Sequence, residues 1–401
     1  MADLVIDIVN SIFAISGIYF TVLFIMLFFS HEKKLFKRPK MKKFPSISII
    51  VPVFNEECII EKTISNVKAM SYPREKEIIV VDDGSTDKTF EILKGIKSIR
   101  VFRKKNGGRA SAVNFGLKRA KGEIIVRIDA DSFPEKNALM KAIPHFEDNV
   151  ASVATTVLIK SPKGLLEKLQ DLEYIMIAWS RKILEYLDAI YVTPGAMSFY
   201  RRDALLKVGG FDEKNLTEDI EIAWRLLKHK YRIKMALDTV VYTKPPNTMR
   251  RWWDQRIRWN IGGMQTFLKY INLFFSKKFK NVGMLLLPLF SISYVLNLIG
   301  FMFTGYVFLR GAEYLVGAYI FGFNPIRISL VLIPDMFVFL AVFSFMLALV
   351  FIKINFRTMK RIGILPVKLA NFMVYLFIYI LLSPLNLLHS TIKFLTGKYK
   401  W

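Results

Sequence analysis

Four long apolar stretches separate a polar central region from the two ends of the chain. They cover residues 8–30, 283–309, 328–352 and 369–392. A helix needs about 20 apolar residues to cross the hydrocarbon core of a bilayer, and each stretch has that length. The pattern predicts an N-terminal transmembrane helix over residues 1–30 and a C-terminal transmembrane region of about three spans over residues 281–401.

Lysine and arginine residues follow the first apolar stretch at high density. Seven of the eleven residues from Lys33 to Lys43 are basic. Cytoplasmic loops of membrane proteins carry such an excess, so we expect a multi-pass plasma-membrane protein whose central region is cytoplasmic. The last apolar stretch contains Pro384 and is followed by a basic tail, so it either crosses the membrane once or ends as a re-entrant or interfacial segment.

The central region has the alternating pattern of an α/β domain. Runs of β-branched residues predict buried parallel strands, and apolar residues at helical spacing between these runs predict helices. We expect strands at residues 46–53, 77–81 and 123–128, and helices at residues 56–70, 87–97 and 220–228. The alternation predicts a doubly wound sheet, in which ligands bind beyond the carboxyl ends of the strands.

Acidic residues follow each predicted strand and would meet at one edge of this sheet. Glu56 follows the first strand, Asp82 and Asp83 the second, and Asp129 and Asp131 the third. Such carboxylates suit a hard divalent cation, Mg²⁺ or Mn²⁺, which shares its remaining positions with phosphate oxygens. The sequence has neither a P-loop nor a Gly-x-Gly-x-x-Gly motif, which disfavours a Walker ATPase and a Rossmann dehydrogenase.

Composition and charge exclude several other classes of protein. Hydrophobic residues make up 53% of the chain, which excludes intrinsic disorder. The 58 Lys and Arg against 33 Asp and Glu give a net charge of +25, but the long uncharged stretches argue against a protein that only binds nucleic acid. Cys58 is the only cysteine, so an intrachain disulfide and a cysteine-ligated metal centre are excluded.

Six segments, in order along residues 46–260, together resemble glycosyltransferase family 2 with the GT-A fold. They are Val-Pro-Val-Phe-Asn-Glu-Glu at 51–57, Val-Asp-Asp-Gly-Ser-Thr-Asp at 81–87, Gly-Gly-Arg-Ala-Ser-Ala-Val-Asn at 107–114, Asp-Ala-Asp at 129–131, Thr-Glu-Asp at 217–219 and Gln-Arg-Ile-Arg-Trp at 255–259. The last two are similar to the membrane-embedded, often processive branch that includes hyaluronan, chitin, cellulose and poly-N-acetylglucosamine synthases. The resemblance implies an α/β GT-A domain at residues 31–250, joined to the α-helical transmembrane region.

The resemblance also assigns roles on the donor side of the site. It implies a UDP-sugar donor and a Mg²⁺ or Mn²⁺ ion held by Asp131. The residues expected to bind the nucleotide sugar are Pro52, Phe54, Glu56, Asp83, Arg109, Asp129 and Ala130. The strongly basic charge is expected to face anionic lipid and to concentrate a negatively charged donor near this site.

The catalytic and acceptor residues follow from the same resemblance. Asp219 would be the general base that takes the acceptor proton, with Glu218 and Arg258 as further catalytic residues. Gly195, Gln255 and Trp259 would bind the acceptor. A single carboxylate base implies single displacement, and hence inversion to a β-linkage from an α-linked donor. An amphipathic helix at residues 251–280, with basic and aromatic residues, is expected to lie on the membrane surface.

Three functions fit these sequence features. The first is a synthase that extends a β-linked polysaccharide and exports it through its own helices, with a homo-oligomer or small accessory subunit completing the channel. The second is a single-step transferase that glycosylates a membrane lipid, either a polyprenyl phosphate or a glycerolipid. The third is a catalytically silent membrane protein that binds anionic lipid or an acidic partner through its basic face.

Overall fold

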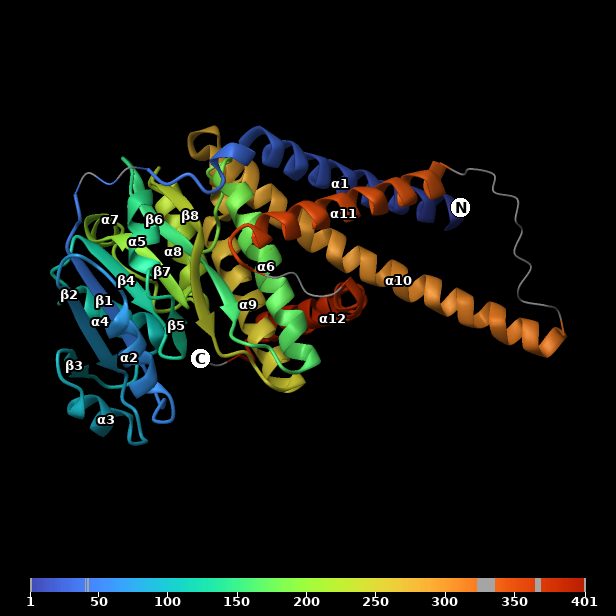
Figure 1. Cartoon of the computed structure of the whole chain (residues 1–401). Coiled ribbons are helices and arrows are strands. Elements are labelled where there is room, and N and C mark those ends of the chain that lie inside the picture. The colour runs from blue at the N-terminus through green and yellow to red at the C-terminus, as the bar shows by residue number, and fades with distance from the viewer. Residues whose placement is uncertain (1, 40, 42, 323–335, 365–368, 400–401) are drawn as a thin grey trace.

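An α/β domain forms one end of the molecule, and long helices project from it (Figure 1). The structure is a computed structural model that describes residues 2–39, 41, 43–322, 336–364 and 369–399. Its strands are β1 (Ile47–Val53), β2 (Lys76–Asp82), β3 (Arg100–Arg103), β4 (Ile124–Ile128), β5 (Ser132–Pro134), β6 (Val150–Ile159), β7 (Met197–Arg201) and β8 (Arg232–Thr243). Its α-helices are α1 (Ala2–His31), α2 (Ile60–Ala69), α3 (Thr89–Gly95), α4 (Arg109–Leu117), α5 (Ala138–Ala142), α6 (Leu165–Glu185), α7 (Arg202–Lys207), α8 (Glu218–Lys228), α9 (Met249–Tyr270), α10 (Leu287–Phe321), α11 (Met336–Lys360) and α12 (Leu369–Leu395).

The central sheet is mixed, with the strand order β3-β2-β1-β4-β7-β6-β8-β5. Strands β3, β2, β1 and β4 are parallel, which confirms the three predicted strands and the parallel arrangement in this half of the sheet. In the other half, β7 runs antiparallel to both β4 and β6, and β5 runs antiparallel to β8. The sheet therefore departs from a purely parallel one at β7, directly beside β4, the strand that Asp129 follows.

Helices cover both faces of the sheet because successive strand residues point to opposite sides. Ile50 of β1 belongs to the core formed with α4, α6, α7 and α8. Its neighbours Ile49 and Val51 belong to the core formed with α2, α3 and α5. Every residue of β1 is buried, and all of them except Ser48 are apolar, as expected for a sheet covered on both faces.

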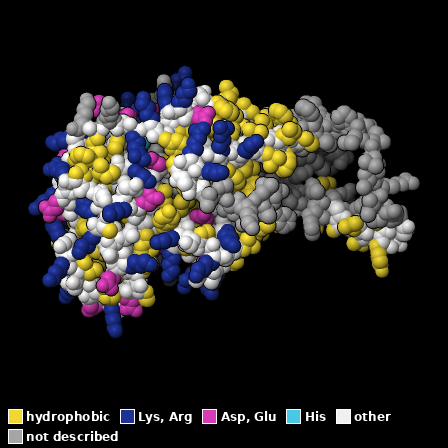
Figure 2. All heavy atoms as spheres, in the orientation of Figure 1, with side chains coloured by type: hydrophobic (Ala, Val, Ile, Leu, Met, Phe, Trp, Pro, Cys, Tyr) yellow, Lys and Arg dark blue, Asp and Glu magenta, His cyan; other side chains and the backbone are white. Residues whose placement is uncertain are grey.

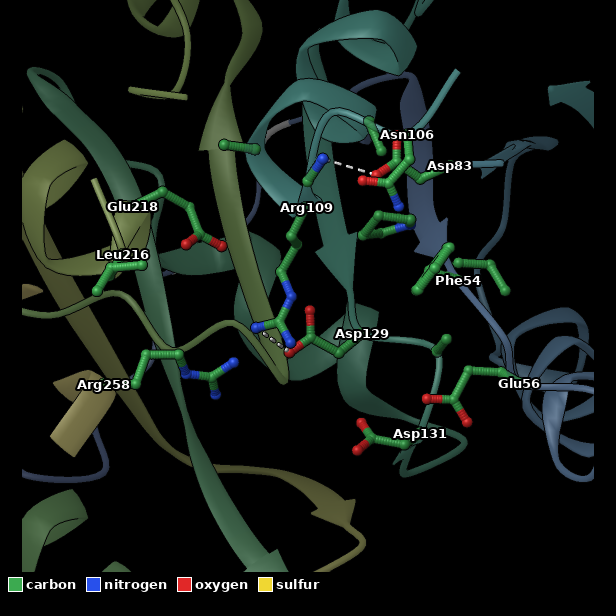
Figure 3. A pocket seen from close by; sticks show the side chains of 16 residues that line it. Phe54, Glu56, Asp83, Asn106, Arg109, Asp129, Asp131, Leu216, Glu218 and Arg258 are labelled. Carbon is green, nitrogen blue, oxygen red and sulfur yellow. Dashed lines mark hydrogen bonds and ion pairs between the residues drawn. The ribbon is translucent and has the colours of Figure 1, made fainter. Parts of the chain in front are cut away.

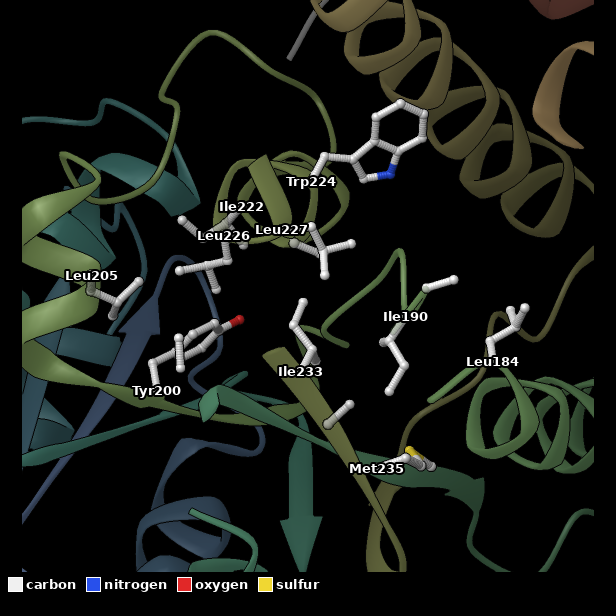
Figure 4. Close-up of a cluster of buried hydrophobic side chains, with 14 of the residues drawn as sticks. Leu184, Ile190, Tyr200, Leu205, Ile222, Trp224, Leu226, Leu227, Ile233 and Met235 are labelled. Atoms are coloured by element: carbon white, nitrogen blue, oxygen red, sulfur yellow. The ribbon is translucent and has the colours of Figure 1, made fainter. Parts of the chain in front are cut away.

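The first of these cores fixes the position of α8. Ile222 and Leu226 of α8 pack with Tyr200 of β7, and Ile233 and Met235 of β8 belong to the same cluster (Figure 4). These side chains are at most 1% exposed. Because Ile222 and Leu226 are buried in this core, the first turn of α8 is held at the carboxyl-terminal edge of the strands. This turn carries the Thr-Glu-Asp motif.

Within the described residues, four helices are long and apolar enough to cross a membrane, at Ile15–Lys34, Val282–Met302, Val342–Lys360 and Val374–Leu395. α1 and α11 pack side by side, whereas α10 diverges from them (Figure 1). Lys and Arg side chains are spread over the α/β domain, and hydrophobic side chains gather where the long helices leave it (Figure 2). Part of the third predicted span, residues 328–335, lies outside the described residues.

The predicted amphipathic helix at residues 251–280 is shorter in the structure. α9 ends at Tyr270, and the chain continues through two 3₁₀ turns, Ile271–Leu273 and Lys277–Phe279. A π-helical segment, Lys280–Leu286, then leads into α10. The Gln-x-x-Arg-Trp motif therefore lies on α9, which is separate from α10 and packs against α8 and α12.

The last helix, α12, lies against the domain along α6 and α9. The Tyr379 hydroxyl donates a hydrogen bond to Glu173 of α6. Farther along, Trp253 of α9 donates its ring N–H to His389 at 3.0 Å, and the Asn386 amide donates to the Trp253 carbonyl at 3.1 Å. These contacts hold the middle and the carboxyl-terminal half of α12 on the domain.

Candidate active site

A cavity of about 410 Å³ opens at the edge of the sheet where β1, β2 and β4 end (Figure 3). Ten of the residues predicted for the site line it: Pro52, Phe54, Glu56, Asp83, Arg109, Asp129, Ala130, Asp131, Glu218 and Arg258. Figure 3 shows Glu218 and Arg258 on one side of the cavity and Phe54 and Glu56 on the other. The structure thus brings together segments that are up to about 200 residues apart in the sequence, because parallel strands end at a common edge.

Asp83 is fixed at the end of β2 by backbone and side-chain donors. The Gly108 N–H donates to its carboxylate at 2.7 Å, the Gly107 N–H at 3.1 Å and the Lys104 ammonium at 2.8 Å. Gly108 has a φ of 86°, in the region that favours glycine. The Gly-Gly pair therefore shapes the loop that orients Asp83, and Asn106 of the same loop also lines the cavity.

Asp129 lies between two guanidinium groups. Arg109 of α4 and Arg127 of β4 each place a nitrogen 3.4 Å from its carboxylate. Burial by itself raises the pKa of Asp129, but the charges of Arg109, Arg127 and Arg258 hold that pKa below the ordinary aspartate value. Asp129 is therefore ionised at neutral pH.

Asp131 differs from Asp129 because no cation pairs with it among the described residues. Burial and the charge of Asp129 raise the pKa of Asp131, and burial and the charge of Asp131 raise the pKa of Glu56. This excess of negative charge is the environment that a bound divalent cation would neutralise. The described residues contain no group of three or more His, Cys, Asp and Glu placed to hold a metal, so phosphate oxygens and water would supply the remaining positions, as they commonly do for Mg²⁺.

The Thr-Glu-Asp motif lies at the start of α8. Glu218 faces the cavity and accepts a hydrogen bond of 2.6 Å from Arg127. Asp219 does not line the two cavities described in this section, and one of its carboxylate oxygens accepts the Ile220 N–H at 3.0 Å. Burial, followed by the charge of Glu218, raises the pKa of Asp219, as suits a general base poised to take a proton.

A second cavity, of about 630 Å³, adjoins the first and shares Glu56, Asp131, Leu216 and Arg258 with it. The basic residues in its wall are Lys244, Arg251, Arg258, Lys393 and Lys398. Gln255 also lines this cavity, and its side-chain oxygen accepts a hydrogen bond of 3.0 Å from Gln170 of α6. The end of α12 and Tyr399 thus lie at the site, although they are distant from it in the sequence.

Gly195 and Trp259 line neither cavity but lie close to residues that do. A Cβ at Gly195 would come within 2.9 Å of the side-chain ends of Arg127 and Asp129, so a larger residue in the loop before β7 would displace these two groups. The Trp259 ring is covered on one face by the Arg256 guanidinium, 4.4 Å from the ring centroid. Arg256 in turn forms an ion pair with Glu173 of α6, which fastens the Gln-x-x-Arg-Trp segment to a second helix.

Two contributors to the site were not predicted from the sequence. Arg127 is fully buried beneath Asp129. Its only signal in the sequence is that a charged residue stands inside a run of β-branched residues. Gly262 of α9 packs so tightly on the Thr-Glu-Asp motif that a Cβ there would lie 2.1 Å from the Thr217 hydroxyl oxygen. No sequence pattern marks that contact, because it depends on how α8 and α9 pack.

The fold and the site define a class of protein. The structure is similar to that of the mannosyltransferase PcManGT from Pyrobaculum calidifontis, solved in complex with GDP-Man and Mn²⁺, with a TM-score of 0.62 and 21% identity over 98% of this chain and 100% of that one. This likeness confirms the predicted GT-A fold.

Sequence comparison gives the family. Residues 48–209 match the family described as Glycosyl transferase family 2. The chain is 31% identical over 287 residues to the probable glycosyltransferase YdaM of Bacillus subtilis, covering 68% of this chain and 66% of that protein. It is 32% identical over 264 residues to a poly-beta-1,6-N-acetyl-D-glucosamine synthase of Staphylococcus epidermidis, covering 63% of this chain and 64% of that protein.

The chain belongs to glycosyltransferase family 2, as its six motifs predicted. The matches span just under two thirds of the length of these relatives.

Proposed function

We propose that the protein transfers a sugar from a UDP-sugar to a growing β-linked polysaccharide and inverts the anomeric configuration. The observation that carries the proposal is the single cavity that gathers Asp83, the Asp-x-Asp motif, Glu218 and Arg258 at one sheet edge. The synthase relatives, at 31–32% identity, support N-acetylglucosamine as the first sugar to test.

The donor half of the cavity has groups of suitable chemistry for each part of a nucleotide sugar. Phe54 is 46% exposed and offers an apolar surface to the nucleobase, while Asp83 has acceptor capacity for its N–H groups. Arg109 and Arg258 provide positive charge for the diphosphate. A bound Mg²⁺ or Mn²⁺ would be held by Asp131 and would stabilise the negative charge on the departing diphosphate.

The base is proposed to be Asp219, which adjoins Glu218 of the cavity wall in the chain. In the proposed reaction Asp219 takes the proton of an acceptor hydroxyl as its oxygen attacks the anomeric carbon, and the bond to the diphosphate breaks on the opposite face. One displacement of this kind inverts the configuration. Gln255, Trp259 and Gly195 are proposed to hold the acceptor sugar, and the basic cluster after α1 supports a cytoplasmic catalytic domain at the plasma membrane.

Polymer export is part of the same proposal. The helices long enough to cross a membrane join the catalytic domain directly, which supports passage of the product between them. We propose that a homo-oligomer or a small accessory subunit completes the channel.

A second candidate function is the glycosylation of a membrane lipid. The observation that favours it is the second cavity, whose wall includes Lys244, Arg251, Lys393 and Lys398 and therefore suits an anionic acceptor such as a polyprenyl phosphate. This cavity lies between the end of α12 and α9, the helix expected to lie on the membrane surface.

Product size distinguishes the two functions. The purified protein in lipid vesicles is incubated with Mg²⁺ or Mn²⁺ and a panel of radiolabelled UDP-sugars, and products are separated by gel filtration and by organic-solvent extraction. We expect glycan of high molecular weight from one donor. A small, solvent-extractable product would establish the lipid acceptor, and no product from any donor would refute transfer from a UDP-sugar.

A further inference from the structure

Arg127 connects the two acidic motifs of the site. It occupies the fourth position of β4, inside a strand of otherwise apolar residues, and its side chain is 0% exposed. One terminal nitrogen lies 2.6 Å from Glu218 and 3.4 Å from Asp129. A single guanidinium therefore joins the Asp-x-Asp motif to the Thr-Glu-Asp motif, which is about 90 residues farther along the chain.

The surroundings of Arg127 leave its side chain little freedom. Its guanidinium carbon lies 5.6 Å from the centroid of the Phe211 ring, and a Cβ at Gly195 would come within 2.9 Å of its terminal nitrogen. Its Nε and its second terminal nitrogen are buried and have no hydrogen-bond partner in the described part of the chain. Since a buried cation is costly unless paired, the two carboxylates are what keep this side chain in place.

We propose that Arg127 is a positioning residue that fixes Glu218, and through it the adjoining Asp219, relative to Asp129. Arg127 does not line the cavity, so it acts on the substrate only through these carboxylates. The assignment of a base to Asp219 rests on the proposed function, whereas the linkage of the two motifs rests on the contacts alone.

Arg127 also influences the protonation of the base. The other titratable and charged groups that face Asp219 are Glu218 on its own helix, Asp129 directly after β4, Tyr200 of β7, Arg109 of α4, Arg181 of α6 and Arg258 of α9. Burial and Glu218 raise the pKa of Asp219, and the positive charge of Arg127 counteracts them. Removal of that charge would raise this pKa further, so transfer would be lost at a higher pH as the solution is acidified.

The test compares Arg127→Gln and Arg127→Lys with Arg201→Gln. Arg201 is a matched control on the neighbouring strand β7, where it donates three hydrogen bonds to the carbonyls of Phe146, Glu147 and Val150, away from the cavity. Hydrogen–deuterium exchange followed by mass spectrometry measures the mobility of residues 216–222. The same variants are assayed for kcat as a function of pH.

For Arg127→Gln we expect exchange at residues 216–222 to rise at least about tenfold, kcat to fall at least about tenfold, and the acidic limb of the pH profile to move to higher pH. Arg127→Lys keeps the charge but is too short to hold both carboxylates, so exchange rises while the acidic limb stays in place. Arg201→Gln should leave residues 216–222 unchanged.

Wild-type exchange at residues 216–222 in a folded Arg127→Gln or Arg127→Lys protein would overturn the proposal. Equal exchange increases in the Arg127 and Arg201 variants would also overturn it, because the effect would then be a general loss of stability. If the wild-type protein transferred no sugar from any donor, the proposed function would fail, but the exchange measurement would still decide the role of Arg127.

Discussion

Gly262 shows how a single residue sets the distance between two functional helices. It lies on α9, four residues after Arg258, and its Cα faces Thr217 at the start of α8. The Asn215 amide and the Leu216 N–H also hydrogen-bond to Thr266 and Gln265 of α9, at 3.0 Å and 2.9 Å. The segment that carries Glu218 and Asp219 is thus fastened to the helix that carries Arg258.

We predict that Gly262→Ala lowers the free energy of unfolding by about 1–3 kcal/mol, because the added Cβ would overlap Thr217. Sugar transfer should fall at least about tenfold, because the two catalytic segments are pushed apart. Gly263→Ala is the matched control: a Cβ there meets no atom within 4 Å. It should leave transfer unchanged. Thermal unfolding and transfer assays on both variants check this, and equal behaviour of the two would refute the close-contact account.

The protonation of Asp219 leads to a prediction about pH. A base must be unprotonated to act, and burial together with the charge of Glu218 raises the pKa of Asp219. Transfer should therefore decline on acidification at a pH above the ordinary aspartate value of about 4. Glu218→Gln removes the neighbouring negative charge and should move the acidic limb to lower pH. A profile of kcat that stays flat down to about pH 4 would contradict this role for Asp219.

At the residue scale, the sequence predicted the groups at strand ends but not those that depend on packing. Asp83, Asp129 and Asp131 could be placed together because parallel strands end at one edge. Arg127 and Gly262 could not, because their roles arise from contacts between segments that are far apart in the chain. The sequence also predicted Asp219 as a residue of the site, but the structure puts Glu218, rather than Asp219, in the cavity wall.

At the scale of elements, the helices around the site are connected by polar contacts. Arg256 of α9 pairs with Glu173 of α6, and Tyr379 of α12 donates to the same carboxylate. Asn260 of α9 donates to the Asn386 side chain of α12 at 3.0 Å. Apolar periodicity located the last helix, but these contacts, which decide where it lies, could not be derived from the sequence alone.

The position of α12 predicts which side of the membrane its end faces. Leu395 is 79% exposed at the end of α12, and the native Cys58 is exposed on the catalytic domain. In sealed vesicles, a membrane-impermeant maleimide should label Leu395→Cys, in a Cys58→Ser background, from the same side as it labels native Cys58. Tyr319→Cys in the same background, at the far end of α10, should be labelled from the opposite side. Labelling of Leu395→Cys from the Tyr319 side would mean that α12 crosses the bilayer.

At the scale of the whole molecule, a basic catalytic domain is joined to a cluster of apolar helices. The net charge of +25 suits both an anionic membrane surface and an anionic donor. The division of the chain into these two parts could be predicted because the apolar stretches are long and flanked by basic residues. The antiparallel half of the sheet and the approach of Lys393 and Lys398 to the site could not, because they depend on the order in which strands and helices pack.

The central claim is metal-dependent transfer of a sugar with Asp219 as the base. It is tested most directly by incubating the wild-type protein and Asp219→Asn, each in lipid vesicles, with radiolabelled UDP-N-acetylglucosamine and the other UDP-sugars. We predict glycan from the wild-type protein only when Mg²⁺ or Mn²⁺ is present, and at least about 100-fold less from Asp219→Asn. Wild-type transfer by Asp219→Asn, or undiminished transfer after chelation of all divalent metal, would contradict the account.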